Sequence, residues 1–287
     1  MIKRHDGRGA ADVRPSTCIL NPFGYADGSV LLKVGKTQVY CAVTMQQGVP
    51  PFLRGQGVGW LTAEYSLLPT STLIRKPREI VSMKRNSRSV EISRLISRAL
   101  RAVIDVNSFG ERTITIDCDV LQADGGTRTA CITASYIALR RAVQQWLAQG
   151  LLKRSILTDE LAAISVGIRD NEVLLDIDYQ EDSSVDADFN FVLTRSGSVI
   201  EVQGTAEKKP VSWELFERAR LMAQQGVEAL CSSLYDATPG DLGLHEDSLT
   251  EEVRANGVSS LVSKQLETKT PLFSLQNRQQ SSSSSSQ

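Results

Sequence analysis

The sequence predicts an α+β protein in which strands and helices mix within one compact unit of two similar halves. Apolar and polar residues alternate as in strands in both halves, and a long helical pattern follows the strands of each half. The chain has 287 residues and 41% hydrophobic content, which is enough for one sizeable core or two small ones. No apolar run approaches membrane-spanning length, and the N-terminal residues are too polar for a signal peptide.

The first half is predicted to begin with a hairpin whose turn is Gly35-Lys36-Thr37, because the flanking residues alternate as strands do. A glycine-rich loop, a further strand and a helix follow. The two hairpin strands are placed at residues 30–34 and 38–43, the loop at 49–60, the further strand at 61–65 and the helix at 92–103. The helix carries its apolar residues at helical spacing and places Arg94, Arg98 and Arg101 on a different face.

The most informative segment ends the first half, where an alternating strand at 113–120 meets two glycines and then a helix. Gly125 and Gly126 end the strand, and Thr127 and Arg128 open the helix. The first amide groups of a helix have no partner within it, and they lie at its positive dipole end. A phosphate here would meet backbone donors, a hydroxyl and a guanidinium together. The alternative is an ordinary connection between a strand and a helix.

The second half repeats the order of strands before a helix. Strands are predicted at 162–168, 172–178, 189–194 and 199–203, and a helix at 213–234. Pro210 precedes this helix, and Ser212 is a candidate cap. We therefore place the folded domain at residues 1–235. Residues 236–287, with the serine run 281–286, are predicted to form a low-complexity, disordered tail.

The formal charge of −1 does not indicate nucleic-acid or membrane binding, so any basic surface must be local. One such region exists, since residues 75–101 contain nine basic and two acidic side chains. The five cysteines lack Cys-x-x-Cys spacing, which argues against a disulfide framework or a zinc site and favours a reducing compartment. His5 and His245 lie in terminal segments, so a Ser-His-Asp unit is disfavoured and carboxylates are the candidate general bases.

A second informative segment, residues 175–190, is crowded with carboxylates in a loop between strands. They are Asp176, Asp178, Glu181, Asp182, Asp186 and Asp188. Carboxylates this close repel one another, and a divalent cation such as Mg²⁺ or Mn²⁺ would relieve the repulsion. The alternative is a solvated acidic turn, and the spacing does not match an EF-hand loop.

An anion-binding turn, an arginine-rich segment and an acidic loop are together the parts of a metal-assisted phosphoryl-transfer site. Arg94, Arg98 and Arg101 are weaker candidates for this site, because arginines on a helix face are more often solvated or salt-bridged.

Several blocks of the chain match a known pattern. The blocks are Arg4-His-Asp-Gly-Arg8, Arg14-Pro15, Gly59-Trp-Leu-Thr-Ala-Glu-Tyr65, Leu68-Pro-Thr-Ser-Thr72, residues 117–130, Ala163-Ile-Ser-Val-Gly167, residues 176–190 and Ile200-Glu-Val-Gln-Gly-Thr-Ala-Glu207. Together they resemble the ribonuclease PH family, phosphate-dependent bacterial exoribonucleases that trim the 3′ ends of tRNA. The blocks are long enough that chance is a poor explanation for the match.

The resemblance implies roles for individual residues. Arg88, Thr127 and Arg128 match the family's inorganic-phosphate site, and Asp182 and Asp188 match its catalytic carboxylates, which hold a Mg²⁺ or Mn²⁺ ion. In that family phosphate attacks in place of water, and terminal nucleotides leave as nucleoside 5′-diphosphates. The resemblance therefore implies a phosphate-dependent tRNA nucleotidyltransferase with inorganic phosphate as co-substrate.

The implied fold is a single α+β catalytic domain of the ribonuclease PH type, with two βαβ-containing halves and a likeness to domain 2 of ribosomal protein S5. The implied assembly is a homo-hexamer built as a trimer of dimers. It would act in the cytoplasm on tRNA 3′ ends and in rRNA processing, without membrane association.

Arg75, Arg78, Lys84 and Arg85 are the candidates for contacts to the RNA backbone, and ion pairs between subunits are the alternative. Ser87 stands where the family usually has a glycine. If that position needs a positive φ, the loop that carries Arg88 would sit differently.

The leading functional hypothesis is a phosphorolytic 3′-to-5′ exoribonuclease. A non-catalytic RNA-binding ring subunit of the same fold is the alternative, and the intact site residues disfavour it. A phosphate-using enzyme of small nucleosides is a third hypothesis, and the size of the basic segment argues against it.

Overall fold

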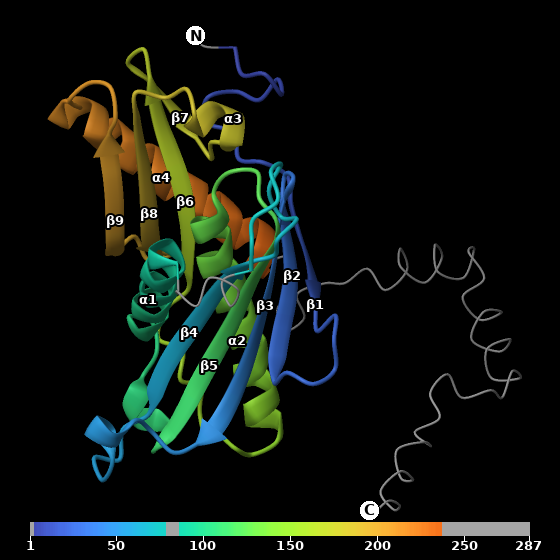
Figure 1. Cartoon of the computed structure of the whole chain (residues 1–287). Coiled ribbons are helices and arrows are strands. Elements are labelled where there is room, and N and C mark those ends of the chain that lie inside the picture. Colours follow the sequence, from blue (N-terminus) through green and yellow to red (C-terminus); the bar gives the residue numbers. More distant parts are fainter. Residues whose placement is uncertain (1–2, 79–85, 237–287) are drawn as a thin grey trace, which may run out of the picture. The chain divides into compact units, whose positions relative to one another are not determined.

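The structure is a computed structural model of the chain, and it describes residues 3–78 and 86–236 (Figure 1). The first of its two sheets has the strand order β1-β2-β3-β5-β4. These strands are β1 (Ser16–Leu20), β2 (Gly28–Val34), β3 (Thr37–Gln47), β4 (Trp60–Leu67) and β5 (Arg112–Gln122). The predicted hairpin is β2 and β3, which pair antiparallel around the turn at Gly35.

Strand β4 is the exception in the first sheet, because it pairs parallel with β5 while the other pairs are antiparallel. Parallel neighbours need a crossover connection, and helix α1 (Ser87–Arg101) lies within it and packs on β4. This β4-α1-β5 unit is the βαβ element of the first half, and Figure 1 shows α1 beside β4. A short helical turn, η1 (Pro51–Leu53), precedes β4, and another, η3 (Val106–Ser108), lies between α1 and β5.

The second sheet has the order β7-β6-β8-β9, and every pairing between these strands is antiparallel. Its strands are β6 (Leu161–Arg169), β7 (Glu172–Leu175), β8 (Ala187–Thr194) and β9 (Val199–Ala206). The one-turn helix α3 (Tyr179–Asp182) lies between β7 and β8. Helix α4 (Trp213–Cys231) follows the sheet, as the sequence predicted, and ends in a π-helical turn, η4 (Ser232–Asp236).

Helix α2 (Thr127–Ala148) contacts strands of both sheets, so it is surrounded by core on several sides. Every residue from 129 to 139 is buried, which explains why the helix lacks a distinct polar face in this stretch. Helix α4 packs on β6, β7 and β8. Because α2 is held by both sheets, its first turn is a rigid support for whatever binds there.

The predicted α+β fold class is confirmed by these sheets and helices. Ser212 caps α4 as predicted, since its side chain accepts a hydrogen bond from the amide of Leu215.

The prediction of a plain loop at residues 175–190 was incomplete, because this segment contains helix α3. The predicted tail from residue 237 onward lies outside the described residues. Within the described part of the chain, no helix has both the length and the apolar character that a membrane crossing requires.

Candidate active site

The turn between β5 and α2 is the first component of the candidate site. Gly125 and Gly126 have φ values of +78° and +63°, which glycine adopts at little steric cost. Gly126 is the N-cap of α2, and it has no side chain that could cap the first amides. The helix is 22 residues long, so its unpaired amides and positive dipole end are available to an anion. We call residues 124–128 the phosphate turn.

Two side chains of the phosphate turn are held by other elements. Thr127 is buried, and its Oγ1 accepts a hydrogen bond of 3.2 Å from the Tyr65 hydroxyl on β4. Burial raises the pKa of Tyr65, so this hydroxyl stays protonated and remains a donor. Arg128 Nη1 donates to Gln203 Oε1 on β9 over 2.6 Å, and it lies 3.6 Å from Glu91 Oε1 on α1. Arg128 therefore joins α2 to both neighbouring elements.

Arg88 lies in the first turn of α1, where the Asn86 side chain caps the helix by accepting from the Arg88 amide at 3.0 Å. Ser87 is the first helical residue of α1, so this position does not need the positive φ that a glycine would supply. Arg88 is exposed. Its positive charge, with that of Arg128, acts on both Tyr65 and Asp182.

The carboxylates of Asp182 and Asp188 form the second component of the site. Asp182 ends α3, and Asp188 is the second residue of β8. Desolvation by the surrounding protein raises the pKa of Asp182, and the charges of Asp188 and Glu207 raise it further, while Arg88 and Arg128 lower it. Desolvation and Glu207 likewise raise the pKa of Asp188. The two candidate groups, arginines and carboxylates, thus share one electrostatic neighbourhood.

The remaining carboxylates of the acidic segment bind partners within the protein. They therefore fit neither the prediction of a solvated turn nor a metal site shared by the whole segment. Asp176 is paired with Arg14, and Glu181 with Arg4, at 2.6 Å each. Asp178 caps α3 and lies 2.6 Å from His5 Nε2. Asp186 accepts from the amide of Asp170 at 3.0 Å. Only Asp182 and Asp188 combine raised pKa values with neighbouring carboxylates in this segment.

Comparison with known proteins identifies the family of the chain. Residues 12–144 match domain 1 and residues 159–226 match domain 2 of the 3′ exoribonuclease family. The chain is 50% identical to ribonuclease PH of Moorella thermoacetica over 227 residues, which cover 79% of this chain and 91% of that protein. It is also 50% identical to ribonuclease PH of Tropheryma whipplei over 229 residues, or 80% of this chain and 93% of that protein.

The chain belongs to the ribonuclease PH family. The resemblance inferred from the sequence blocks is therefore confirmed. Solved structures share the fold at lower identity. An Archaeoglobus fulgidus exosome with RNA bound to its active site matches at a TM-score of 0.68 and 23% identity, over 79% of this chain and 91% of that chain. Rice Rrp46 matches at a TM-score of 0.62 and 21% identity, over 77% of this chain and 95% of that chain.

Three residues of the candidate site have no role predicted from the sequence, although two of them lie in the quoted blocks. Gln203 holds Arg128, and its own amide donates to Glu201 at 3.1 Å. Glu207 adds a third negative charge beside the aspartate pair. Glu91 approaches Arg128 from α1. The sequence around a single glutamine or glutamate carries no pattern that indicates a distant partner, so only the tertiary structure identifies these contacts.

The basic residues of the segment 75–101 separate into two groups. Arg98 makes an ion pair of 2.7 Å with Glu201, and Arg101 stacks over the Trp60 ring at 4.4 Å, which agrees with the structural interpretation of this helix face. Arg75 and Arg78 are exposed. Burial raises the pKa of Asp119, and the positive charge of nearby Arg78 partly opposes that rise. The predicted RNA-binding residues Lys84 and Arg85 lie outside the described residues.

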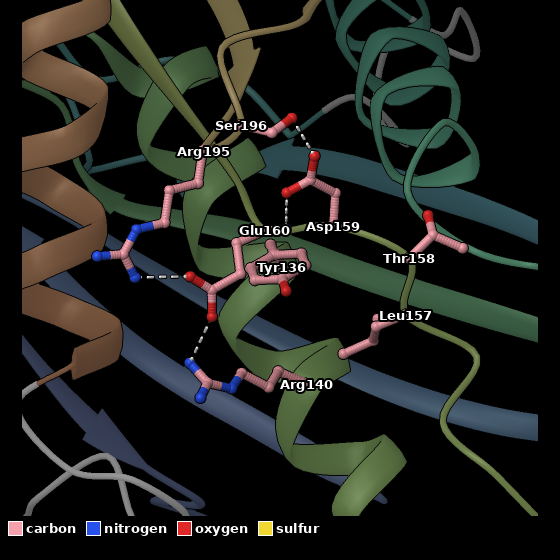
Figure 2. Close-up of a pocket in the computed structure, with 8 residues that line it drawn as sticks. All are labelled: Tyr136, Arg140, Leu157, Thr158, Asp159, Glu160, Arg195 and Ser196. Carbon is pink, nitrogen blue, oxygen red and sulfur yellow. Dashed lines mark hydrogen bonds and ion pairs between the residues drawn. The ribbon is translucent and has the colours of Figure 1, made fainter.

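A separate pocket is lined by residues that the sequence analysis did not single out (Figure 2). Glu160 forms ion pairs with Arg140 at 3.3 Å and with Arg195 at 3.0 Å, and Ser196 donates to Asp159 at 2.6 Å. Figure 2 shows these side chains turned toward one another. Because the charges in the pocket compensate one another, we interpret it as a structural ion-pair network.

Proposed function

We propose that this chain is a phosphorolytic 3′-to-5′ exoribonuclease that shortens the 3′ ends of tRNA precursors and other RNAs. The 50% identity to proteins named ribonuclease PH, over most of the chain, supports the activity. One structural observation carries the assignment to residues. The phosphate turn packs against the start of α3, since a Cβ atom at Gly125 would lie 2.5 Å from the carbonyl carbon of Asp178, and the charges of Arg88 and Arg128 oppose the rise in the pKa of Asp182.

In the proposed reaction, an oxygen of inorganic phosphate attacks the phosphorus of the last phosphodiester bond. The bond from this phosphorus to the 3′ oxygen of the preceding nucleotide breaks. The terminal nucleotide leaves as its 5′-diphosphate, and the 3′ oxygen of the shortened RNA takes up a proton. Arg88, Arg128 and the first amides of α2 would hold the phosphate in line for attack, which replaces a random encounter with an oriented one.

The aspartate pair fits a divalent cation such as Mg²⁺ or Mn²⁺. Carboxylate oxygens are the ligands these ions prefer, and the raised pKa values of Asp182 and Asp188 reflect crowding that a cation would relieve. The described residues contain no cluster of three or more potential ligands, so waters and substrate oxygens would complete the coordination. When bound, the ion would offset the negative charge that develops on the transferring phosphoryl group.

A pH dependence follows from the charges around the aspartate pair. Both carboxylates must be ionised to hold a cation, and both have pKa values above the ordinary 3.8, so binding is lost as the pH falls through the raised values. Glu207→Gln removes a charge that raises both pKa values, so we expect the acid limb of Mn²⁺ binding and turnover to move to lower pH. An unchanged or upward-shifted limb would contradict this role of Glu207.

RNA would reach the site across exposed basic side chains. Arg75 and Arg78 are the described candidates, and such contacts to phosphates position a strand without selecting its sequence. We further propose a homo-oligomer, a hexamer formed as a trimer of dimers, which light scattering would detect as six times the 31.4 kDa chain mass. A cytoplasmic location agrees with the five cysteines, all of which are free thiols.

The decisive assay supplies a short RNA with a single-stranded 3′ end in phosphate buffer or in sulfate buffer of equal ionic strength. Sulfate is also a tetrahedral anion, but it does not act as the nucleophile in this reaction. We expect nucleoside 5′-diphosphates with phosphate and no release with sulfate. Equal release in both buffers, or monophosphate products, would exclude phosphorolysis. Turnover of uridine in place of RNA would instead indicate a nucleoside-specific enzyme.

A further inference from the structure

Arg14 precedes β1, and its side chain is buried between two segments of the candidate site. Its Nε and Nη2 donate to the two carboxylate oxygens of Asp176 at 2.9 and 2.6 Å, and its backbone amide donates to the same carboxylate at 2.7 Å. The remaining Nη1 donates to the Asp124 carbonyl at 2.9 Å. Arg14 is 4% exposed and Asp176 is 5% exposed, so water does not screen this pair. One guanidinium therefore bonds the phosphate turn and the acidic segment at once.

In the acidic segment, Asp176 lies just before the helix α3 that carries Asp182. Its φ of +50° is unusual for a residue other than glycine, and its backbone carbonyl accepts from Arg4 at 3.1 Å and from Arg8 at 2.9 Å. Two residues later Asp178 caps α3, which ends at Asp182. The position of Asp176 thus sets where α3 starts and where the Asp182 carboxylate is presented.

On the other side, the phosphate turn packs directly against this cap. A Cβ atom at Gly125 would lie only 2.5 Å from the carbonyl carbon of Asp178, and one at Gly126 would lie 2.9 Å from Arg14 Nη2. Thr37 steadies the same turn, because its hydroxyl donates to the Gly125 carbonyl at 2.8 Å and accepts from the Asp124 amide at 3.0 Å. The two halves of the site therefore meet backbone to backbone, with the Arg14 guanidinium at the junction.

We propose that Arg14 is a positioning residue, which fixes the phosphate turn relative to the segment that carries Asp182. This inference rests on the proposed phosphorolysis and deepens it. Arg14 would contact neither phosphate nor RNA, and it would act only by holding two parts of the site in register. Phosphoryl transfer depends on in-line placement of the nucleophile, and a displacement of about 1 Å in such a site can cost about a hundredfold in rate.

The proposal requires the shape of the guanidinium as well as its charge. A guanidinium is planar and rigid, so it can donate to a carboxylate with one edge and to a carbonyl with the other. A lysine ammonium is a single charged centre on a flexible stem. Arg14→Lys would keep a positive charge beside Asp176, but it would not hold Asp176 and the Asp124 carbonyl at a fixed separation.

The test compares Arg14→Lys with the wild-type full-length protein in two measurements. The first is the rise in melting temperature with added inorganic phosphate, which reports binding without turnover. The second is the KM for phosphate and the kcat at saturating RNA. We expect Arg14→Lys to raise the phosphate KM about tenfold or more, to lower kcat, and to weaken the phosphate-induced thermal shift.

Arg140→Lys is the matched control. Arg140 lies on α2, the helix that begins at the phosphate turn, twelve residues and about 18 Å beyond Arg128. Its side chain forms an ion pair with Glu160, which lies outside this helix. We expect this variant to keep the wild-type phosphate KM and thermal shift, whatever melting temperature it loses. Wild-type phosphate binding and kcat in Arg14→Lys, or losses no larger than those of Arg140→Lys, would overturn the proposal.

Asp176→Asn provides a second route if Arg14→Lys does not fold. Asparagine tolerates the positive φ of this position better than most residues, but it loses the bidentate charged contact with Arg14. We expect the same rise in phosphate KM, and an unchanged KM would count against Arg14. If the wild type binds phosphate but releases no diphosphates, phosphorolysis fails, and the thermal shift still decides the role of Arg14.

Discussion

Replacing Asp188 with asparagine is expected to lower RNA phosphorolysis by about a thousandfold, because an amide is a weak ligand for a hard cation and carries no charge. The substitution keeps the size of the side chain. The backbone of Asp188 pairs with Gly167 and Thr205 independently of its side chain, so β8 should stay in register. Release of nucleoside diphosphates from a labelled RNA measures the effect. Wild-type turnover in this variant would exclude Asp188 from the reaction.

Asp186→Asn is the matched control, since it makes the same chemical change two residues earlier in the chain. The Asp186 carboxylate accepts from the amide of Asp170 and is turned to the β6-β7 connection. We therefore expect turnover within a few fold of the wild type. If both variants lost activity equally, the loss would reflect damage to the acidic segment in general, and the assignment of Asp188 would not stand.

Asp188→Asn is also expected to raise the stability of the metal-free protein at neutral pH. The folded-state pKa values of Asp182 and Asp188 are raised above 3.8, so the folded protein binds protons over a pH range in which the unfolded chain has released them. Stability from these groups falls as the pH rises through that range, and the repulsion is fully present above it. Without divalent cations at neutral pH, Asp188→Asn should melt at a higher temperature than the wild type, and Mn²⁺ should stabilise only the wild type.

Much of the fold could be predicted because its elements leave local patterns. Strand β5 alternates between a buried and a more exposed face, and two glycines form the turn between it and α2. The hairpin β2-β3 and the Ser212 cap of α4 are likewise local features. Helix α3 could not be predicted in this way, since a single turn is too short to show helical spacing.

The number of acidic residues in segment 175–190 did not indicate which of them pair with arginines and which lie beside other carboxylates. Asp176 and Asp182 are six residues apart in the same segment, yet one is paired with a buried arginine and the other faces repelling carboxylates. The decisive partner, Arg14, lies 162 residues away from Asp176. A contact between such distant positions leaves no periodicity in a single sequence, so the role of the N-terminal block emerged only from the structure.

Arg128→Ala is expected to reduce kcat/KM for phosphate by about a hundredfold or more, which corresponds to roughly 3 kcal/mol of transition-state stabilisation. The loss follows from removing a charged donor at the start of α2, beside the proposed phosphate. Arg128 bonds Gln203 and Glu91 of its own chain, so we expect light scattering to show an unchanged assembly. An assembly defect as large as the loss of activity would contradict this role.

Gln203→Leu tests whether the placement of Arg128 matters in addition to its charge. The variant retains the guanidinium but removes the acceptor that holds it at 2.6 Å, so we expect a smaller loss, of about tenfold. Gln224→Leu is the control, since Gln224 accepts from Arg220 on α4. Both site variants should act on the KM for phosphate. If they raised the KM for RNA alone, Arg128 would be a contact to the RNA backbone, and the anion at the start of α2 would be the scissile phosphate instead of the attacking one.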